Sequence, residues 1–166
     1  MTSGRFVRNA TPEDAGRLAE IYNQGIEERI ATFETEPRSP AEIAAWFENG
    51  YPVFVAGAGD RVMAYSVAYP YRPRRCYEGV REFSIYTARE ARGSGFGRAA
   101  LSALIDHAKT RGWWKLLSRV FPENIASRAL LQSAGFREVG IYEKHGQLDG
   151  VWRDVVIVER LIPENL

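Results

Sequence analysis

The chain has 166 residues, of which 45% are hydrophobic and 26% are charged, and its formal net charge is +1. This length suits one domain with a sizeable core, and the near-neutral charge argues against a surface built to bind nucleic acid. The single cysteine, Cys76, excludes an internal disulfide. Residues 1–8 lack the apolar stretch of a signal peptide, and no segment approaches the roughly 18 apolar residues of a membrane span. We therefore expect one cytoplasmic domain, residues 1–166, that binds neither nucleic acid nor a membrane.

Strand and helix patterns alternate along the chain. In order we predict a strand at 5–8, helices at 11–26 and 39–47, a hairpin of strands 52–56 and 61–68, a strand at 80–87, a helix at 97–112, a strand at 114–121, a helix at 124–134, and strands at 136–142 and 152–161. In the strand at 80–87, Phe83 and Ile85 share one face, while Glu82, Ser84 and Tyr86 share the other. This order predicts a mixed α/β domain.

The most specific segment is Arg92-Gly93-Ser94-Gly95-Phe96-Gly97, which lies between a predicted strand and a predicted helix. Its glycines let the backbone turn tightly and direct several free N–H groups toward one point at a helix N-terminus, where the helix dipole favours an anion. A Walker A loop would need Lys and then Ser or Thr after Gly97, and a dinucleotide fingerprint would need glycine at position 98. Because arginine stands there, the loop indicates a pyrophosphate site of another kind.

This loop, read as Arg92-x-x-Gly95-x-Gly97, resembles the signature of the GNAT superfamily of acyl-CoA-dependent N-acyltransferases. The resemblance implies an α/β (α+β) fold in which a mixed, mostly antiparallel sheet of six to seven strands is flanked by about four helices. It also implies acetyl-CoA as cosubstrate, bound by the loop residues Arg92, Gly93, Ser94, Gly95, Phe96, Gly97 and Arg98. The alternative is a glycine-rich turn that only lets a helix pack close to a strand.

A second segment, residues 124–136, resembles the other hallmark of the superfamily, an Asn-led helix that ends in Gly-Phe. The resemblance implies that Asn124 and Ser127 contact the pantetheine arm and phosphates of the cofactor. Asn124 is also a good N-cap for any helix, as Gly135 is a good C-cap. Many members have a tyrosine where Leu131 stands, and this tyrosine acts as the acid that protonates the leaving thiolate. Protonation of the leaving thiolate therefore falls to another group, such as a water or Tyr142.

Residues 32–40 and 77–82 resemble the corresponding loops of phosphinothricin N-acetyltransferases, and the likeness extends from Val7 to about Val158. Members of this group acetylate the α-amino group of glutamate-like toxins: phosphinothricin, methionine sulfoximine and arsinothricin. The resemblance implies that the substrate is a small acidic amino-acid analogue, and it makes a homodimer plausible. Which analogue is used, and whether the role is detoxification or housekeeping, does not follow from the sequence.

Acetyl transfer to an amine needs a base, because an α-ammonium group is mostly charged at pH 7. Glu82 lies ten residues before Arg92, on the strand that leads to the loop. The phosphinothricin group has its general base at this position, so we predict Glu82 as the base; the alternative is an ion-pair partner for Arg81 or Arg89. We also expect the main-chain N–H groups of Ile85 and Tyr86 to bind the cofactor and polarise its thioester.

The loop before this strand carries three arginines, whose guanidinium forks suit the carboxylate and phosphinate oxygens of a doubly anionic substrate. We predict that Arg72 and Arg74 bind the substrate, because alternate residues of an extended segment point the same way; a solvated basic loop is the alternative. Phe33 is a candidate wall of the pocket or a core anchor. Asp149 is a candidate substrate contact, although a hairpin turn at Asp149-Gly150 is the stronger interpretation.

The sequence predicts no metal site, since neither histidine has a second ligand nearby. Our leading hypothesis is acetyl transfer from acetyl-CoA to the amino group of a small acidic amino-acid analogue, with Glu82 as base. Two alternatives stay open. One keeps the fold and changes the acceptor to a protein N-terminus, a polyamine or an aminoglycoside. The other is a CoA-binding regulatory module without catalysis.

Overall fold

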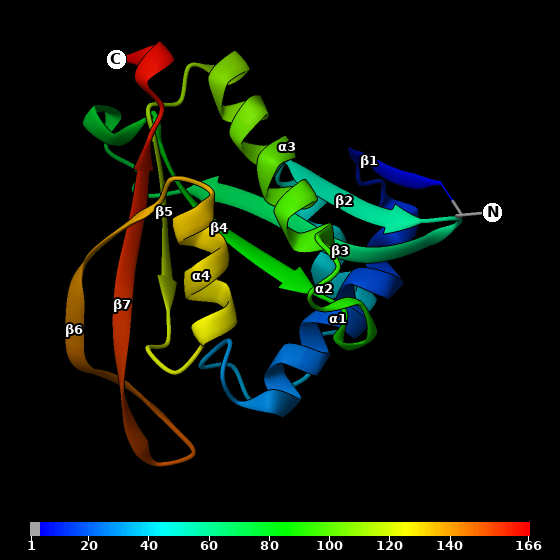
Figure 1. The fold of residues 1–166 in the computed structure, drawn as a ribbon, viewed down its shortest axis with the longest axis horizontal. Helices are drawn as coiled ribbons and strands as arrows, with labels where there is room; N and C mark the ends of the chain where they lie inside the picture. Colours follow the sequence, from blue (N-terminus) through cyan, green and yellow to red (C-terminus); the bar gives the residue numbers. More distant parts are fainter. Residues whose placement is uncertain (1–3) are drawn as a thin grey trace.

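The computed structural model describes residues 4–166, which form a single mixed sheet with helices on both faces (Figure 1). The strands are β1 (Arg5–Asn9), β2 (Val53–Ala58), β3 (Arg61–Pro70), β4 (Val80–Thr87), β5 (Lys115–Val120), β6 (Arg137–Leu148) and β7 (Val151–Leu161). The helices are α1 (Ala15–Glu28), α2 (Pro40–Glu48), α3 (Phe96–Arg111) and α4 (Ile125–Ser133). The predicted fold class, with its mostly antiparallel sheet and four helices, is confirmed.

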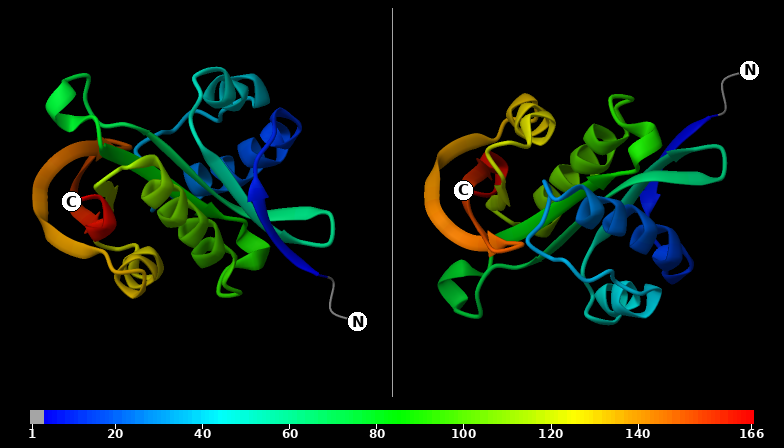
Figure 2. Two further views of the ribbon diagram at one scale, coloured as in Figure 1. Left: turned by 90° about the horizontal axis from the view of Figure 1, so that it is seen from above. Right: turned by 90° about the horizontal axis from the view of Figure 1, so that it is seen from below.

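The strand order is β1-β2-β3-β4-β5-β7-β6, and every neighbouring pair is antiparallel except β4 and β5. Helices α1 and α2 cover one face of the sheet, and α3 and α4 cover the other (Figure 2). On the first face, Leu18 and Ile43 are fully buried against β2 and β3. On the second face, Leu104 of α3 and Leu131 of α4 pack with buried side chains of β4, β5 and β7.

The parallel pair is the feature that shapes the centre of the molecule. β4 pairs with β5 only at Val80, Arg81 and Glu82. Beyond Glu82 the two strands diverge, and β4 runs toward α1 while β5 turns away (Figure 1). The first residue past the pairing, Phe83, still accepts a hydrogen bond at its carbonyl from the Ser118 hydroxyl (2.8 Å). The rest of β4 has no strand partner on this side, which leaves main-chain groups free at the middle of the sheet.

One helix start matches the prediction from local sequence, and the other lies four residues later than predicted. The Ser39 hydroxyl accepts a hydrogen bond from the Glu42 amide (3.3 Å), with Pro40 at the first position of α2. Thr11 and Pro12 open a short 3-10 turn at 12–14, and α1 begins only at Ala15. None of the helices described for residues 4–166 is long and apolar enough to cross a membrane.

The β6 strand is longer than its sequence predicts, because it continues from 142 to Leu148. Two register irregularities interrupt its pairing with β7, and Lys144 has a φ of 47°. Residues 143–147 are polar or glycine, so they show none of the apolar alternation by which a strand is recognised. Pairing with β7 in the folded protein forms this part of the strand.

Candidate active site

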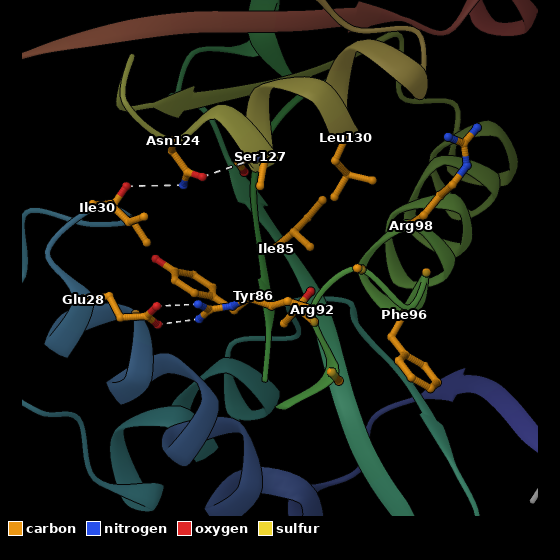
Figure 3. A pocket seen from close by; sticks show the side chains of 18 residues that line it. Glu28, Ile30, Ile85, Tyr86, Arg92, Phe96, Arg98, Asn124, Ser127 and Leu130 are labelled. Atoms are coloured by element: carbon orange, nitrogen blue, oxygen red, sulfur yellow. Dashed lines mark hydrogen bonds and ion pairs between the residues drawn. The ribbon is translucent and has the colours of Figure 1, made fainter. Parts of the chain in front are cut away.

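A cleft of about 440 Å³ opens beside the divergent end of β4. Its walls come from the end of α1, the segment 30–31, β4, the glycine loop with the start of α3, and the first turns of α4 (Figure 3). Apolar side chains dominate these walls, among them Ile30, Ile85 and Leu130. The glycine loop closes one end of the cleft. A long apolar channel that ends in backbone donors can hold a phosphate group and an apolar arm together.

The glycine loop presents the N-terminus of α3 to this cleft. Gly95 is the N-cap of α3 and has a φ of 88°, a conformation that favours glycine. Gly97 allows α3 to approach β4, since a Cβ there would lie 2.7 Å from the Thr87 hydroxyl oxygen. Ser94 does not line the cleft, and its carbonyl accepts a hydrogen bond from Arg5 of β1 (2.6 Å). A hydrogen bond from β1 thus helps to fix the position of the glycine loop.

Arg92, the first residue of the predicted motif, lines the cleft and is ion-paired with Glu28 at the end of α1 (Figure 3). Two guanidinium nitrogens bind the two carboxylate oxygens of Glu28. The hydrogen bonds from Arg92 lower the pKa of Glu28, and the carboxylate raises the pKa of Arg92. Both groups therefore stay charged at neutral pH, and the pair joins α1 to the glycine loop across the floor of the cleft.

Asn124 and Ser127 lie at the opposite wall, on α4 (Figure 3). The Asn124 side chain accepts a hydrogen bond from the Ser127 amide (3.2 Å) and donates one to the carbonyl of Ile30 (3.3 Å). Asn124 is therefore the N-cap of α4, as its sequence position suggested, and it also ties α4 to the segment after α1. Arg98 lines the cleft from α3, and its guanidinium donates to the Ser133 hydroxyl (2.6 Å).

The free edge of β4 runs along the same cleft. The Phe83 carbonyl faces β5, as its bond from Ser118 shows. Main-chain groups alternate along a strand, so Ile85, two residues on, directs its amide to the same open side. Tyr86 pairs with Tyr65 of β3 in the sheet register and reaches the cleft with its side chain. The site therefore offers the Ile85 main chain and the Tyr86 ring.

Glu82 stands where β4 and β5 part. It is the last β4 residue that pairs with β5, opposite Leu117, and it lies opposite Tyr69 in β3. One carboxylate oxygen accepts a hydrogen bond from Arg119 of β5 (2.9 Å), and 23% of the Glu82 side chain is exposed. Its ion-pair partner is thus Arg119 rather than Arg81 or Arg89, the two candidates considered from the sequence. A solvent-reachable carboxylate at the fork of the sheet can accept a proton.

Residues 6–137 match the profile of the acetyltransferase (GNAT) domain. The chain belongs to the GNAT acetyltransferase family. It is 30% identical to the L-methionine sulfoximine/L-methionine sulfone acetyltransferase of Pseudomonas aeruginosa, over 92% of each chain. A solved ribosomal-protein-alanine N-acetyltransferase from Brucella melitensis is 34% identical, with a TM-score of 0.90 over 95% of this chain and 99% of that one. A phosphinothricin acetyltransferase from Sinorhizobium meliloti, solved in complex with AcCoA, is 33% identical, with a TM-score of 0.88 over 98% and 89% of the two chains. The predicted family and the prediction of an enzyme are confirmed.

In this acetyltransferase the predicted substrate contacts lie outside the cleft. Arg72 and Arg74 are exposed in the loop before β4, and the Arg72 guanidinium lies over the ring of Tyr71, 4.9 Å from its centroid. The loop leaves β3 directly after Pro70, and the residue before it, Tyr69, lies opposite Glu82 in the register of β3 and β4. The loop therefore starts near Glu82.

Phe33 and Asp149 have structural contacts in the acetyltransferase. The Phe33 ring packs edge-on against Phe121, with 4.8 Å between centroids, and joins a small core formed by β6 and β7. Asp149 occupies the β6–β7 turn with a φ of 52° and pairs with Arg29 (3.0 Å). Tyr142, the candidate acid, is half exposed on β6 beside His145. Leu131 is buried in α4 and lines the gap between β4 and β5.

A second pocket, of about 280 Å³, lies on the α1–α2 side of β4. It is lined by Tyr22, Arg38, Tyr65, Tyr69, Ser84 and Tyr86, among others. The sequence did not single out Arg38, Tyr65 or Tyr69 as site residues, since aromatic residues in a strand and an arginine in a loop carry no local functional signal. Within residues 4–166, no group of three or more His, Cys, Asp and Glu side chains is placed to hold a metal ion.

Proposed function

We propose that the enzyme transfers acetyl from acetyl-CoA to the α-amino group of a small acidic amino-acid analogue of the phosphinothricin, methionine sulfoximine or arsinothricin type. The observation that carries the proposal is the position of β4 between the cleft and the second pocket. Ser84 and Tyr86 of this strand line the second pocket, while Tyr86 also lines the cleft. A cofactor on one side and an acceptor on the other can therefore meet at the strand that bears Glu82.

The cleft suits acetyl-CoA, which when bound supplies the acetyl group as a thioester. Main-chain amides from Gly93 to Arg98 and the α3 dipole would hold the pyrophosphate. Ile30, Ile85 and Leu130 would contact the apolar part of the pantetheine arm. Asn124 and Ser127 border the same path, and the free Ile85 amide would donate to the cofactor at the edge of β4. All the cofactor-binding residues predicted from the sequence line the cleft except Ser94, and Ile30 and Leu130 are additions from the structure.

Glu82 is proposed as the general base. The amine nitrogen forms a bond to the acetyl carbon, the carbon–sulfur bond breaks, and one amine proton passes to Glu82 directly or through a water. Glu82 shares the face of β4 with Ser84 and Tyr86, by the period of two along the strand. The ion pair with Arg119 fixes the orientation of the carboxylate. Since Leu131 has no proton to give, water is the proposed acid for the thiolate.

Arg72 and Arg74 are proposed to attract the acidic acceptor to this side of the sheet. Both are exposed in the described residues, and their loop leaves β3 one residue after Tyr69, which lies opposite Glu82 in the sheet register. A guanidinium there can meet the negative charge of the acceptor as it approaches, and exposed charges of this kind act mainly on association. The relatives named for phosphinothricin and methionine sulfoximine support this substrate class.

The test is release of thiol from acetyl-CoA, measured with phosphinothricin, methionine sulfoximine, glutamate, an alanine-ended peptide and an aminoglycoside. We expect turnover with the glutamate-like toxins and little with the last two acceptors. Turnover confined to the peptide or the aminoglycoside would overturn the proposed acceptor and leave the family assignment intact.

A protein N-terminus is the second candidate acceptor, because a solved ribosomal-protein-alanine N-acetyltransferase is 34% identical to this chain. The small volume of the second pocket, about 280 Å³, favours a single amino acid over a peptide. The peptide arm of the thiol-release experiment separates the two candidates.

We further propose a cytoplasmic homodimer. The β6–β7 hairpin exposes large apolar side chains, including Ile141, Val151 and Trp152, each more than half exposed. Apolar groups gathered at the edge of a sheet are typical of a protein interface. Light scattering coupled to gel filtration should give twice the chain mass of 18.7 kDa, and a single-chain mass would contradict the dimer.

A further inference from the structure

The second pocket is unusually rich in hydroxyl groups. Six of its lining residues carry one: Tyr22, Thr32, Tyr65, Tyr69, Ser84 and Tyr86. They come from α1, the α1–α2 loop, β3 and β4, so the folded chain brings them together from four segments. Hydroxyl groups around a small cavity can donate to the oxygens of an acidic ligand. The pocket therefore has the chemistry of an oxygen-binding site.

One of these hydroxyls has no partner within the described part of the chain. Tyr65 has no exposed surface, and its hydroxyl oxygen is buried without a hydrogen bond. Its ring is held between Trp46 and Tyr86, with centroid distances of 5.7 and 5.6 Å. Burial raises the pKa of this hydroxyl well above its ordinary value, so it remains a donor at physiological pH. An unsatisfied buried donor is costly, and a ligand oxygen in the pocket would satisfy it.

Arg38 supplies the positive charge of the pocket; none of the other lining residues that the structure describes there is a lysine or arginine. Its backbone is fixed to α1, because its amide donates to the Asn23 side chain (2.8 Å) and its carbonyl accepts from the same side chain (3.0 Å). The guanidinium lies over the Tyr22 ring, 4.5 Å from the centroid. It is only loosely paired with Glu34, at 3.5 Å, and half of that glutamate is exposed. Such a weak surface pair leaves Arg38 able to bind an anion.

The second pocket extends to β4, the strand that bears Glu82. The Tyr69 hydroxyl is hydrogen-bonded to Ser84 of β4. Glu82 lies directly opposite Tyr69 in the register of β3 and β4, which places Glu82 near this rim of the pocket. In an α-amino acid the amine and the carboxylate share one carbon. If the amine is at β4, the group that extends farthest into the pocket is therefore the end of the side chain.

We propose that this pocket receives the acidic side-chain end of the acceptor, with Arg38 as its charged partner and the Tyr65 hydroxyl as a further donor. Arg38 is thus a specificity-determining residue that favours acceptors with an anionic side chain over those with a neutral one. The inference rests on the proposed function, and it names the residues that distinguish phosphinothricin from methionine sulfone.

The test compares Arg38→Gln with a control variant, Arg61→Gln. Arg61 is the first residue of β3 and forms a similar surface pair with Glu90. We expect Arg38→Gln to raise KM for phosphinothricin about 10- to 100-fold, and KM for methionine sulfone less than about threefold. For phosphinothricin, the KM of Arg38→Lys should lie between the KM of the wild type and that of Arg38→Gln. The KM of Arg61→Gln should match that of the wild type. Equal effects of Arg38→Gln on the two acceptors, or no effect on either, would overturn the proposal.

A binding measurement separates this inference from the proposed function. Titration calorimetry of phosphinothricin into the enzyme saturated with CoA reports binding without turnover. If the wild-type enzyme binds phosphinothricin but does not acetylate it, the proposed function fails; the inference then stands if Arg38→Gln abolishes the binding. If Arg38→Gln binds as the wild type does, or if the wild type does not bind, the inference fails. Tyr65→Phe should weaken binding several-fold without lowering Tm, which excludes loss of folding as the cause.

Discussion

Arg92 holds both carboxylate oxygens of Glu28, across 64 residues of sequence. The arginine begins the glycine loop, and the glutamate ends α1, so the pair joins the loop to the helix that carries Tyr22, a lining residue of the second pocket. Both side chains line the cleft. An ion pair at this place sets the position of the loop relative to α1.

Removing either partner should weaken cofactor binding. We expect Glu28→Ala and Arg92→Ala each to raise KM for acetyl-CoA about fivefold or more, because each leaves the loop without its tie to α1. In the double variant the second change should add little, since both remove the same interaction. A double-mutant cycle on the dissociation constant of acetyl-CoA measures this. Fully additive effects would show that the two residues act separately.

Glu82→Gln should remove the base and leave the cofactor site intact. We expect kcat to fall about 100-fold or more, as for other general bases, while the dissociation constant of acetyl-CoA stays within about twofold. Exposed Glu90→Gln is the control and should retain turnover. If Glu82→Gln keeps turnover within about threefold of the wild type, Glu82 is not the base.

Alanine substitutions of the two glycines at the start of α3 should destabilise the protein for different reasons. Gly95→Ala places a side chain at a φ of 88° with no neighbour closer than 3.6 Å, so its cost of about 1–2 kcal/mol is conformational. Gly97→Ala instead puts a Cβ 2.7 Å from the Thr87 hydroxyl oxygen. Thr87→Ala should therefore restore much of the stability of Gly97→Ala and none of that of Gly95→Ala, as measured by urea unfolding. Equal rescue of both would contradict this explanation.

Tyr65→Phe should stabilise the free enzyme, because it removes a buried hydroxyl without a partner in the described structure. The expected gain in the free energy of unfolding is about 1–3 kcal/mol, the cost of such a group. Tyr69→Phe is the matched control: its hydroxyl is bonded to Ser84, so its loss should destabilise by about 0.5–1.5 kcal/mol. A destabilising Tyr65→Phe would mean that the hydroxyl is satisfied in solution.

Acid should destabilise the fold in a defined range of pH. Hydrogen bonds, first from Arg17, lower the pKa of Glu90 from 4.5 to about 2, and those from Arg92 lower that of Glu28. A carboxyl whose pKa is lower in the folded state binds more protons when unfolded, so its stabilisation is full above about pH 4.5. It is lost as the pH falls toward 2. Urea unfolding between pH 6 and pH 2 should show this loss, reduced in 1 M salt because the pairs are exposed. Unchanged stability from pH 5 to pH 3 would contradict it.

Local sequence was sufficient for the type and order of the main elements and for recognising the glycine loop before α3. The period of apolar residues marked α3, and the alternation in 80–87 placed Glu82 on the face of Ser84 and Tyr86, because both patterns depend only on backbone geometry. The glycine loop was readable for the same reason: a positive φ at Gly95 and a helix N-terminus are properties of neighbours in the chain.

Other contacts could not be read because they join distant segments. The partner of Glu82 is Arg119, 37 residues away, and the contact exists only because β5 pairs with β4 up to Leu117, two residues before Arg119. The sequence left Phe33 as either a pocket wall or a core anchor, and only the fold decides for the anchor, because its ring packs on Phe121 in the small core beside β6 and β7. Nothing in residues 143–147 marks them as a strand until β7 lies beside them.

The sequence by itself determined the order of strands and helices, the glycine loop before α3 and the position of Glu82 on β4, since each follows from spacing along a few residues. The tertiary structure decided where β4 and β5 part and which side chains meet there. Arg38 and Tyr65 line one pocket only because α1 and α2, with the loop between them, pack over β3 on one face of the sheet. Their roles depend on burial and on distances between separate segments, and both quantities are set by packing of the whole chain.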